Sequence, residues 1–453
     1  MNFVKSYANF FNKYVPSPFS IAIFLSFSTL ILALIFTGHQ YSLVEYAPKL
    51  GSSWFNGMFK PDLLSFTVHM MLILVLGHVL ALTKTFNFII NKALFFCKDT
   101  PTAAFTITLL TILVAMFNWG LGLIFGAIFA RKIGEHFQKE NRKLNYTLIG
   151  AAAYVGLMVW HGGLSGSAPL TVADKHHSLF AEMGVISTSA TIFSPMNIFN
   201  SLMIIIVLPL VMYFVGKKST KEVIPMLKSE LKFTSKLDRD EPSDRIEKSE
   251  ILSKIIGIMI LLVFVFAVIQ KLRNGTRFFN ILDLQTTNLL LFGLTITLHK
   301  NLKVFLNAVQ ESIGDISSIL IQFPLYFGIM GIIQESGLAS LIATTIISAA
   351  NQFTLPIYTF ISASIVNMFV PSGGGQWQVQ GPIIVESALK TGTSLPKMIM
   401  AFAYGDQLTN MLQPFWALPL LAITGLKAKD ILPYTLILFI AGFFIFLITL
   451  IIF

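Results

Sequence analysis

Residues 371–382 combine glycines, a serine and glutamines between two apolar runs, residues 353–370 and 383–389. Inside a lipid bilayer every backbone N–H and C=O group needs a partner, so irregular backbone is tolerated only where protein surrounds it or water reaches it. The N–H groups of Gly373, Gly374 and Gly375 can approach an anion closely because glycine carries no Cβ. The segment therefore predicts a binding site for an anionic group such as a carboxylate.

The glutamine side chains of this segment strengthen the prediction. Gln376 can add a donor, and the alternate spacing of Gln378 and Gln380 predicts an extended or turn segment that presents both amides to one side. A tight hairpin turn that needs glycine only for its conformation is the alternative, but a turn alone does not require three glutamines at membrane depth. The predicted substrate-binding residues of this segment are Ser372, Gly373, Gly374, Gly375, Gln376 and Gln378.

A second helix-breaking segment, residues 161–169, interrupts an apolar span at residues 146–173. Its glycines and proline make an uninterrupted helix unfavourable, so the span is predicted to be broken there. His161 could titrate or bind the carboxylate, although an interior histidine with satisfied hydrogen bonds fits equally well. The residues of this break predicted to face the substrate are Gly162, Gly163, Ser165 and Ser167.

Asp406 lies within a third polar segment, inside an apolar run that is predicted as a second broken span at residues 398–422. A buried carboxylate is costly, and its usual justification is an ion, a proton or a basic partner. We predict a coupling-ion site of Asp406, Thr409, Asn410 and His161, with H⁺ and Na⁺ as equal candidates. Structural hydrogen bonding by Asp406 is the alternative. No other metal and no organic cofactor are predicted.

An acyl chain attached to the carboxylate would need an apolar wall. Trp377 would either cover such a chain or pack in the interior or at the membrane interface. The aromatic residues near the polar segments that are available for this wall are Phe117, Trp119, Trp160, Trp377 and Phe415.

The composition of the chain places these segments in a membrane. Of its 453 residues 55% are hydrophobic and only 12% are charged, and the mean hydropathy is +0.74. Apolar runs of about 20 residues recur along the chain, as membrane-crossing helices require, whereas a barrel would alternate. The formal charge of +10 falls mostly between the apolar runs, which indicates orientation in the membrane rather than binding of nucleic acid. The lone Cys97 excludes an internal disulfide.

A charged linker divides the chain into two membrane halves, residues 1–215 and 251–453. Residues 216–250 contain nine basic and eight acidic side chains. Lys217 and Lys218 beside a span end place this linker, and by the same rule the N-terminus, in the cytoplasm.

The two halves are predicted to be inverted repeats, each with a re-entrant hairpin. Basic residues on both sides of residues 103–130 require that segment to enter and leave on the cytoplasmic side, with a tip at residues 118–122. Residues 151–170 match residues 401–420 weakly at a constant offset of 250. When the membrane crossings are counted along the chain, the hairpin near residues 353–389 enters the membrane from the outside. The same count places Lys271, Arg273 and Arg277 outside, against the positive-inside tendency. The predicted fold is an all-α polytopic membrane protein with two inverted-topology repeats, paired re-entrant hairpins and broken helices.

Residues 370–382, 161–169 and 403–410 together resemble the bacterial short-chain fatty acid transporter family, and the resemblance extends over essentially the whole chain. It implies a multi-pass protein of the bacterial inner membrane that takes up small monocarboxylates such as butyrate or acetoacetate. It also implies membership of a wider superfamily of ion-coupled carboxylate carriers, which have paired re-entrant hairpins and are often homodimers.

We therefore predict a secondary active transporter whose partners are a small carboxylate and the lipid bilayer. An exchanger of other small organic anions, such as dicarboxylates, also fits the sequence. A passive anion channel is a further alternative; it would differ from a transporter in that its flux neither saturates nor accumulates substrate against a gradient. A membrane enzyme would use His161, Asp406 and Ser165, but the sequence has no metal-ligand pair, nucleophile elbow or nucleotide-phosphate loop. The chain is therefore predicted not to be an enzyme.

Overall fold

The computed structural model describes all of the chain except residues 1–15, 39–41, 220–243, 276–280 and 282. Most of the charged linker, the N-terminal segment and Arg277 therefore lie outside the described residues. Within the described part the protein is helical and contains no strand.

The helices of the first half are α2 (Pro18–Thr37), α3 (Leu43–Met58), α4 (Pro61–Ala81), α5 (Lys84–Leu94), α6 (Thr100–Phe117), α7 (Trp119–Lys139), α8 (Tyr146–Tyr154), η1 (Val155–Met158), α9 (Ser167–Thr171), α10 (Phe180–Met183) and α11 (Pro195–Lys218). Those that follow are α12 (Asp244–Glu247), α13 (Glu250–Arg273), α14 (Leu284–Leu298), α15 (Leu302–Ser312), η3 (Ile313–Ile316), α16 (Ser317–Ser336), α17 (Leu338–Ile347), α18 (Leu355–Asn367), α19 (Gly373–Thr391), α20 (Leu395–Thr409), η4 (Asn410–Leu412), α21 (Pro414–Thr424) and α22 (Ala428–Ile452).

Seven of the described helices are long and apolar enough to cross a bilayer: α2, α4, α6, α11, α13, α16 and α22. Their outer faces carry exposed phenylalanine, leucine and isoleucine side chains; α13, for example, is mostly exposed despite being almost entirely apolar. Such a surface is stable only against lipid or another apolar partner. The prediction of an all-α polytopic membrane protein is confirmed.

Helices α6 and α7 form a helical hairpin that turns at Asn118 and covers the predicted hairpin near residues 103–130. Its re-entrant course through the membrane stays a prediction. The backbone of Asn118 is extended, and its side-chain oxygen accepts a hydrogen bond from the Leu121 N–H at 3.0 Å. Gly122 allows the two arms to touch, because a Cβ there would lie 2.5 Å from the Cβ of Ala115. Asn118 itself is buried, so the tip of the hairpin ends inside the protein.

The second hairpin consists of α18 and α19, joined by residues 368–372. The Ser372 side chain caps α19 by accepting the Gly375 N–H. The prediction of an extended segment at Gln378 and Gln380 is wrong, since helix α19 begins at Gly373. Helical spacing instead places Gln376 and Gln380 on one buried face and Gln378 on the exposed one.

Both predicted helix breaks are present and pack against each other. The first follows η1, where the chain is irregular until α9, and the second separates α20 and η4 from α21 at Gln413. The Tyr154 hydroxyl donates to the Asn410 carbonyl at 2.8 Å, and the Asn410 side chain donates to the Leu157 carbonyl at 3.2 Å.

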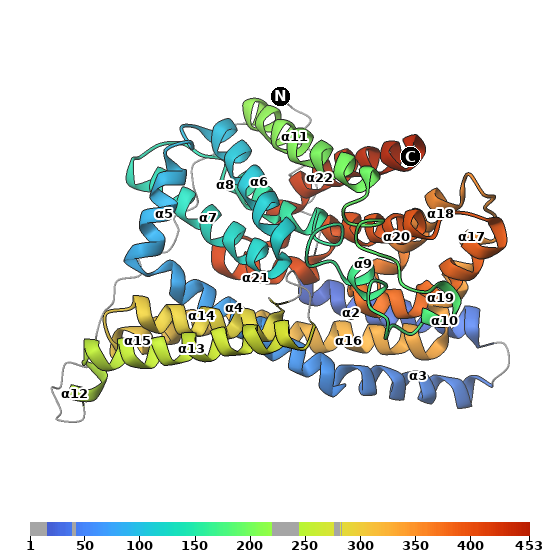
Figure 1. Cartoon of the computed structure of the whole chain (residues 1–453), viewed down its shortest axis with the longest axis horizontal. Coiled ribbons are helices and arrows are strands. Elements are labelled where there is room, and N and C mark those ends of the chain that lie inside the picture. Colours follow the sequence, from blue (N-terminus) through green and yellow to red (C-terminus); the bar gives the residue numbers. More distant parts are fainter. Residues whose placement is uncertain (1–15, 39–41, 220–243, 276–280, 282) are drawn as a thin grey trace.

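The hairpins α6–α7 and α18–α19 lie on opposite sides of the broken helices, and α2, α3 and α16 with α13 and α14 form a layer beneath them (Figure 1). The order of elements from α4 to α8 is similar to that from α16 to α20: a long helix, a short helix, a hairpin and a helix that breaks. This order agrees with a repeat, and its inverted orientation across the membrane stays a prediction.

Candidate binding site

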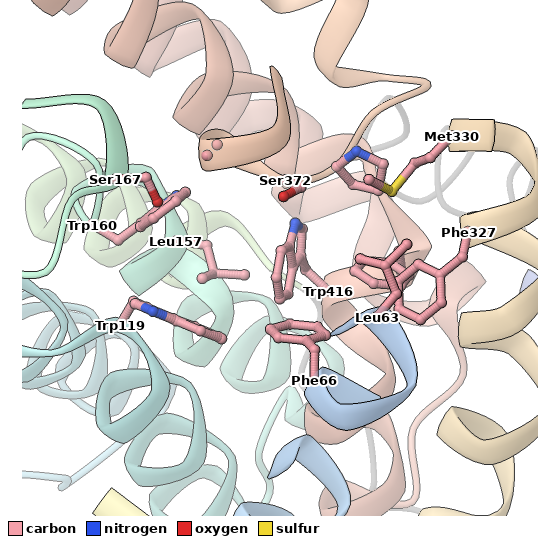
Figure 2. A pocket seen from close by; sticks show the side chains of 14 residues that line it. Leu63, Phe66, Trp119, Leu157, Trp160, Ser167, Phe327, Met330, Ser372 and Trp416 are labelled. Carbon is pink, nitrogen blue, oxygen red and sulfur yellow. The ribbon is translucent and has the colours of Figure 1, made fainter. Parts of the chain in front are cut away.

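A cavity of about 160 Å³ lies where the two hairpin tips meet the two helix breaks. The tip of α6–α7 contributes Trp119, and the tip of α18–α19 contributes Ser372. Figure 2 shows the aromatic side chains gathered around this space with the Ser372 hydroxyl among them. The lining residues are Leu63, Phe66, Trp119, Leu157, Trp160, Ser167, Phe327, Met330, Pro371, Ser372, Gly373, Gly374, Phe415 and Trp416.

The N-terminus of α19 forms the polar end of this cavity. The Gly373 and Gly374 N–H groups belong to the first helical turn, where no intrahelical acceptor exists. The Ser372 hydroxyl accepts the third N–H, that of Gly375, at 3.3 Å. No acidic residue lies in the first turn of this 19-residue helix, so the positive end of its dipole favours an anion at this position.

The remaining walls are aromatic and aliphatic. The Trp119 ring lies 5.3 Å from that of Trp416 and 6.2 Å from that of Trp160, and Phe66 packs edge-on to Trp416 at 6.1 Å between ring centroids. An engineered apolar cavity of about 150 Å³ holds one benzene molecule, and butyrate has as many non-hydrogen atoms as benzene. The cavity thus has one polar end, which favours an anion, and apolar walls that enclose room for about six non-hydrogen atoms.

A buried histidine–aspartate pair lies directly behind the polar end. His161 Nδ1 is 3.0 Å from Asp406 Oδ2, and both side chains are almost fully buried. The Ala168 N–H donates to His161 Nε2 at 2.9 Å, so Nε2 carries a lone pair and the proton of the ring is on Nδ1. This tautomer allows the ring to donate its Nδ1–H to the Asp406 carboxylate.

Gly373 connects this pair to the cavity. A Cβ on Gly373 would lie 2.7 Å from His161 Cε1 and 3.0 Å from Asp406 Oδ2, so only glycine fits between them. Trp160 stacks on His161 at 4.5 Å between ring centroids and separates the imidazole from the cavity. The carboxylate of Asp406 and an anion bound at the α19 N-terminus would be near neighbours.

Gln407, which the sequence analysis did not select, and the predicted Ser165 and Gly163 hold the first break in place. The Gln407 side-chain oxygen accepts the N–H groups of His161 and Gly162, at 3.1 and 3.2 Å. The Ser165 hydroxyl accepts the Trp119 N–H at 3.0 Å, which ties the break to the tip of the first hairpin. The Gly163 N–H donates to the Trp160 carbonyl.

Thr409 and Asn410 are engaged by a residue that the sequence did not single out. Asn367, at the end of α18, donates its side-chain amide to the Asp406 carbonyl at 2.7 Å, to Thr409 Oγ1 at 2.9 Å and to Asn410 Oδ1 at 3.1 Å. The four predicted coupling residues therefore divide into two sets. His161 and Asp406 lie beside the cavity, whereas Thr409 and Asn410 face the amide of Asn367.

The structure brings only some of the predicted substrate residues to the cavity. Ser372, Gly373, Gly374 and Ser167 line it. Gln376 instead donates to the Ala363 carbonyl and to Gln380, across the hairpin. The predicted residues that do not line the cavity are Gly162, Gly163, Ser165, Gly375, Gln376 and Gln378.

The aromatic prediction is partly reproduced. Trp119, Trp160 and Phe415 line the cavity, whereas Phe117 is exposed and Trp377 packs on Phe402 in a separate apolar cluster. Trp416, adjacent to Phe415 at the start of α21, could have been included from its position beside the break. No local pattern marks Leu63, Phe66, Phe327 or Met330, which come from helices without a polar break.

Comparison of the sequence with known proteins identifies the family to which this chain belongs. The family model described as "Short chain fatty acid transporter" matches residues 2–453. A provisionally named short-chain fatty acid transporter of Escherichia coli (strain K12) is 35% identical over 430 residues, covering 94% of this chain and 93% of that protein. A protein of Haemophilus influenzae (strain ATCC 51907 / DSM 11121 / KW20 / Rd) with the same provisional name is 34% identical over 450 residues, covering 96% of both chains.

Two solved transporter structures are similar to this chain at lower sequence identity. The YdaH transporter of Alcanivorax borkumensis is 14% identical with a TM-score of 0.42, covering 95% of this chain and 98% of that one. MtrF of Neisseria gonorrhoeae, from a class of antimetabolite efflux pumps, is 15% identical with a TM-score of 0.38, covering 98% of this chain and 97% of that one. The full-length family match and the two relatives at about one-third identity establish that this chain belongs to the short-chain fatty acid transporter family.

Proposed function

We propose that this protein is a secondary carrier that binds one short-chain monocarboxylate, such as butyrate or acetoacetate, in the cavity between the hairpin tips. The observation that carries the proposal is the opening of the α19 N-terminus, at Ser372–Gly374, into a small cavity with aromatic walls. The carboxylate would accept the Gly373 and Gly374 N–H groups, and the acyl chain would lie against Trp119, Trp416 and Phe66.

Cavity size supports the choice of substrate class. A second carboxylate, as in a dicarboxylate, would have to lie among the aromatic side chains, where the lining offers no basic residue. Burying an unpaired charge there costs several kcal/mol. A long acyl chain would exceed the volume. The site therefore favours short monocarboxylates over the two neighbouring classes of organic anion.

The position of Asp406 supports proton coupling. A charged Asp406 and a substrate carboxylate would repel each other across Gly373 by on the order of 2–3 kcal/mol, for charges about 6 Å apart at an effective dielectric constant of about 20. A proton on Asp406 removes this repulsion, so binding of the proton and binding of the anion reinforce each other. The protein would then carry both in the same direction.

The geometry favours H⁺ over Na⁺ as the coupling ion. The Thr409 and Asn410 oxygens accept hydrogen bonds from the Asn367 amide, and the amide hydrogens between them would repel a cation. Asp406 is paired with a histidine nitrogen, which donates or accepts a proton, whereas hard cations are bound by oxygen ligands. These two sets of contacts support transfer of a proton rather than coordination of a metal ion.

We also propose the bacterial inner membrane as its location, with the N-terminus in the cytoplasm. Pro18 at the start of α2 lines the same surface hollow as Lys427 and Lys429, and Arg131 donates to the nearby Ile423 carbonyl. One end of the molecule thus combines the start of the first span with basic side chains, which is the pattern of a cytoplasmic face.

Uptake of labelled butyrate into proteoliposomes tests the function. We expect saturable uptake that accumulates butyrate when the outside is more acidic than the lumen, and competition by acetoacetate but not by succinate. Because neutral butyric acid crosses lipid unaided, protein-free liposomes under the same gradient are the control. Uptake no greater than in these liposomes, across several short acids and under either a H⁺ or a Na⁺ gradient, would contradict the proposal.

A further inference from the structure

A second hollow of about 540 Å³ lies at the surface beside α21, and nothing in the carrier mechanism above uses it. It combines two lysines with an apolar wall. The residues that line it are Pro16, Ser17, Pro18, Phe19, Gln322, Leu418, Leu421, Ala422, Leu426, Lys427, Ala428 and Lys429.

This hollow and the central cavity are connected by the same two helices. At the start of α21 Phe415 and Trp416 line the cavity, and within the next two turns Leu418 and Leu421 line the hollow. On α16, Phe323 stacks on Phe415 at 4.1 Å between ring centroids, and the preceding residue, Gln322, lines the hollow. The Phe323–Phe415 contact thus joins the two helices that line both spaces.

The polar groups of the hollow suit a carboxylate. Lys427 and Lys429 both line the hollow, and the Asp430 carboxylate accepts the backbone N–H of Lys427 at 2.8 Å. Gln322 is more than nine-tenths buried, and its carboxamide oxygen has no hydrogen-bond partner among the described residues. The N–H groups of this amide can donate to a carboxylate, its oxygen can accept the O–H of the protonated acid, and leucine side chains can contact an acyl chain.

We infer that this hollow is an entry or exit vestibule, in which the basic residues Lys427 and Lys429 collect a short-chain carboxylate and Gln322 holds it before it passes the Phe323–Phe415 contact. Basic clefts raise the local concentration of small anions and their on-rates by about tenfold or more. The inference rests on the proposed function for the identity of the anion, but the attraction of anions to the hollow can be measured without any transport.

A cysteine reporter tests the vestibule in purified protein. Cys97→Ser removes the native thiol, and Phe19→Cys places a reporter at a half-exposed position that lines the hollow. Its rates with an anionic and a cationic methanethiosulfonate are compared with those of Phe353→Cys, which is exposed and does not line the hollow. We expect the anionic-to-cationic rate ratio at Phe19→Cys to exceed that at Phe353→Cys by about tenfold. We also expect millimolar butyrate to slow the modification.

Matched variants assign the effect to the named residues. Lys427→Gln with Lys429→Gln should abolish the preference, while Lys390→Gln, an exposed lysine elsewhere, should not. Gln322→Leu should weaken protection by butyrate. Equal rates of the two reagents, or a preference that survives loss of both lysines, would overturn the vestibule even if butyrate uptake is normal. Loss of the preference in nanodiscs only when anionic lipid is present would show a lipid headgroup site and would also overturn it.

Discussion

At the scale of single residues, Gly374 provides the most selective test of the anion site. A Cβ on Gly374 meets nothing closer than Ser167, at 3.9 Å, so Gly374→Ala should fold normally while covering the amide that the substrate needs. A hydrogen bond to a charged group contributes about 1.5–3 kcal/mol. We therefore expect the butyrate Kd, measured by titration calorimetry, to rise about tenfold or more.

Gly51→Ala is the matched control for this variant, because Gly51 is an exposed helical glycine with no neighbouring atom within 4 Å of an added Cβ. It should bind butyrate as the parent protein does. Unchanged affinity in Gly374→Ala would show that the α19 N-terminus does not hold the carboxylate.

Asp406 can be tested separately, as the coupling residue. Asp406→Asn resembles the protonated acid, so we expect it to exchange labelled for unlabelled butyrate but to lose stimulation by an inward H⁺ gradient. Both are measured in proteoliposomes. Glu386→Gln, which removes an exposed carboxylate, should keep both activities. If Asp406→Asn retains its full response to the H⁺ gradient, another group carries the proton.

The sequence indicated the glycines at the polar end of the cavity, but it did not indicate the roles of the neighbouring polar side chains. Gly373 and Gly374 were identifiable because helix-breaking residues within an apolar run are unfavourable in a membrane unless protein or water surrounds their backbone. The roles of Gln376, Thr409 and Asn410 were not identifiable, because polar side chains at membrane depth serve equally as ligands and as structural hydrogen-bond partners. Here Gln376 binds the neighbouring hairpin arm and Asn367 engages the other two.

At the scale of elements, α18 and α20 show how closely the hairpin packs on the broken helix. A Cβ on Gly405 would lie 2.3 Å from the Phe360 carbonyl oxygen and 2.8 Å from the Ala363 Cβ. We expect Gly405→Ala to destabilise the protein by about 1–3 kcal/mol through overpacking, despite the better helix propensity of alanine. Thermal unfolding in detergent measures this.

Gly51→Ala again serves as the control and should unfold at or above the melting temperature of the parent protein, since alanine favours an exposed helix. A Gly405→Ala protein as stable as this control would mean that α18 and α20 are further apart than the structure places them.

Three of the helices that the sequence failed to predict share a pattern. Apolar runs of about 20 residues and clusters of glycine and proline revealed the long spans, the two hairpins and both breaks. Helices α3, α5 and α15 are shorter and have polar residues on one face, so a search for continuous apolar runs passes over them. Their amphipathic period was present in the sequence and could have located them.

At the scale of the whole molecule, the predicted inverted topology places Lys218, at the end of α11, in the cytoplasm and Phe353, before α18, outside. We expect a membrane-impermeant maleimide added to intact cells to label Phe353→Cys and to label Lys218→Cys only after permeabilisation. Both variants carry Cys97→Ser. Labelling of both residues from one side would contradict the inverted repeat while leaving the cavity unchanged.

The central claim is that one small cavity recognises both the carboxylate and a short acyl chain. Titration calorimetry of the purified protein with acetate, butyrate, octanoate and butanol tests this most directly. We predict that butyrate binds more tightly than acetate, which leaves the aromatic wall empty, and than octanoate, which exceeds the cavity, and that butanol does not bind because it lacks the charge for the α19 N-terminus. Equal affinity for butyrate and octanoate, or binding of butanol as tight as that of butyrate, would contradict the claim.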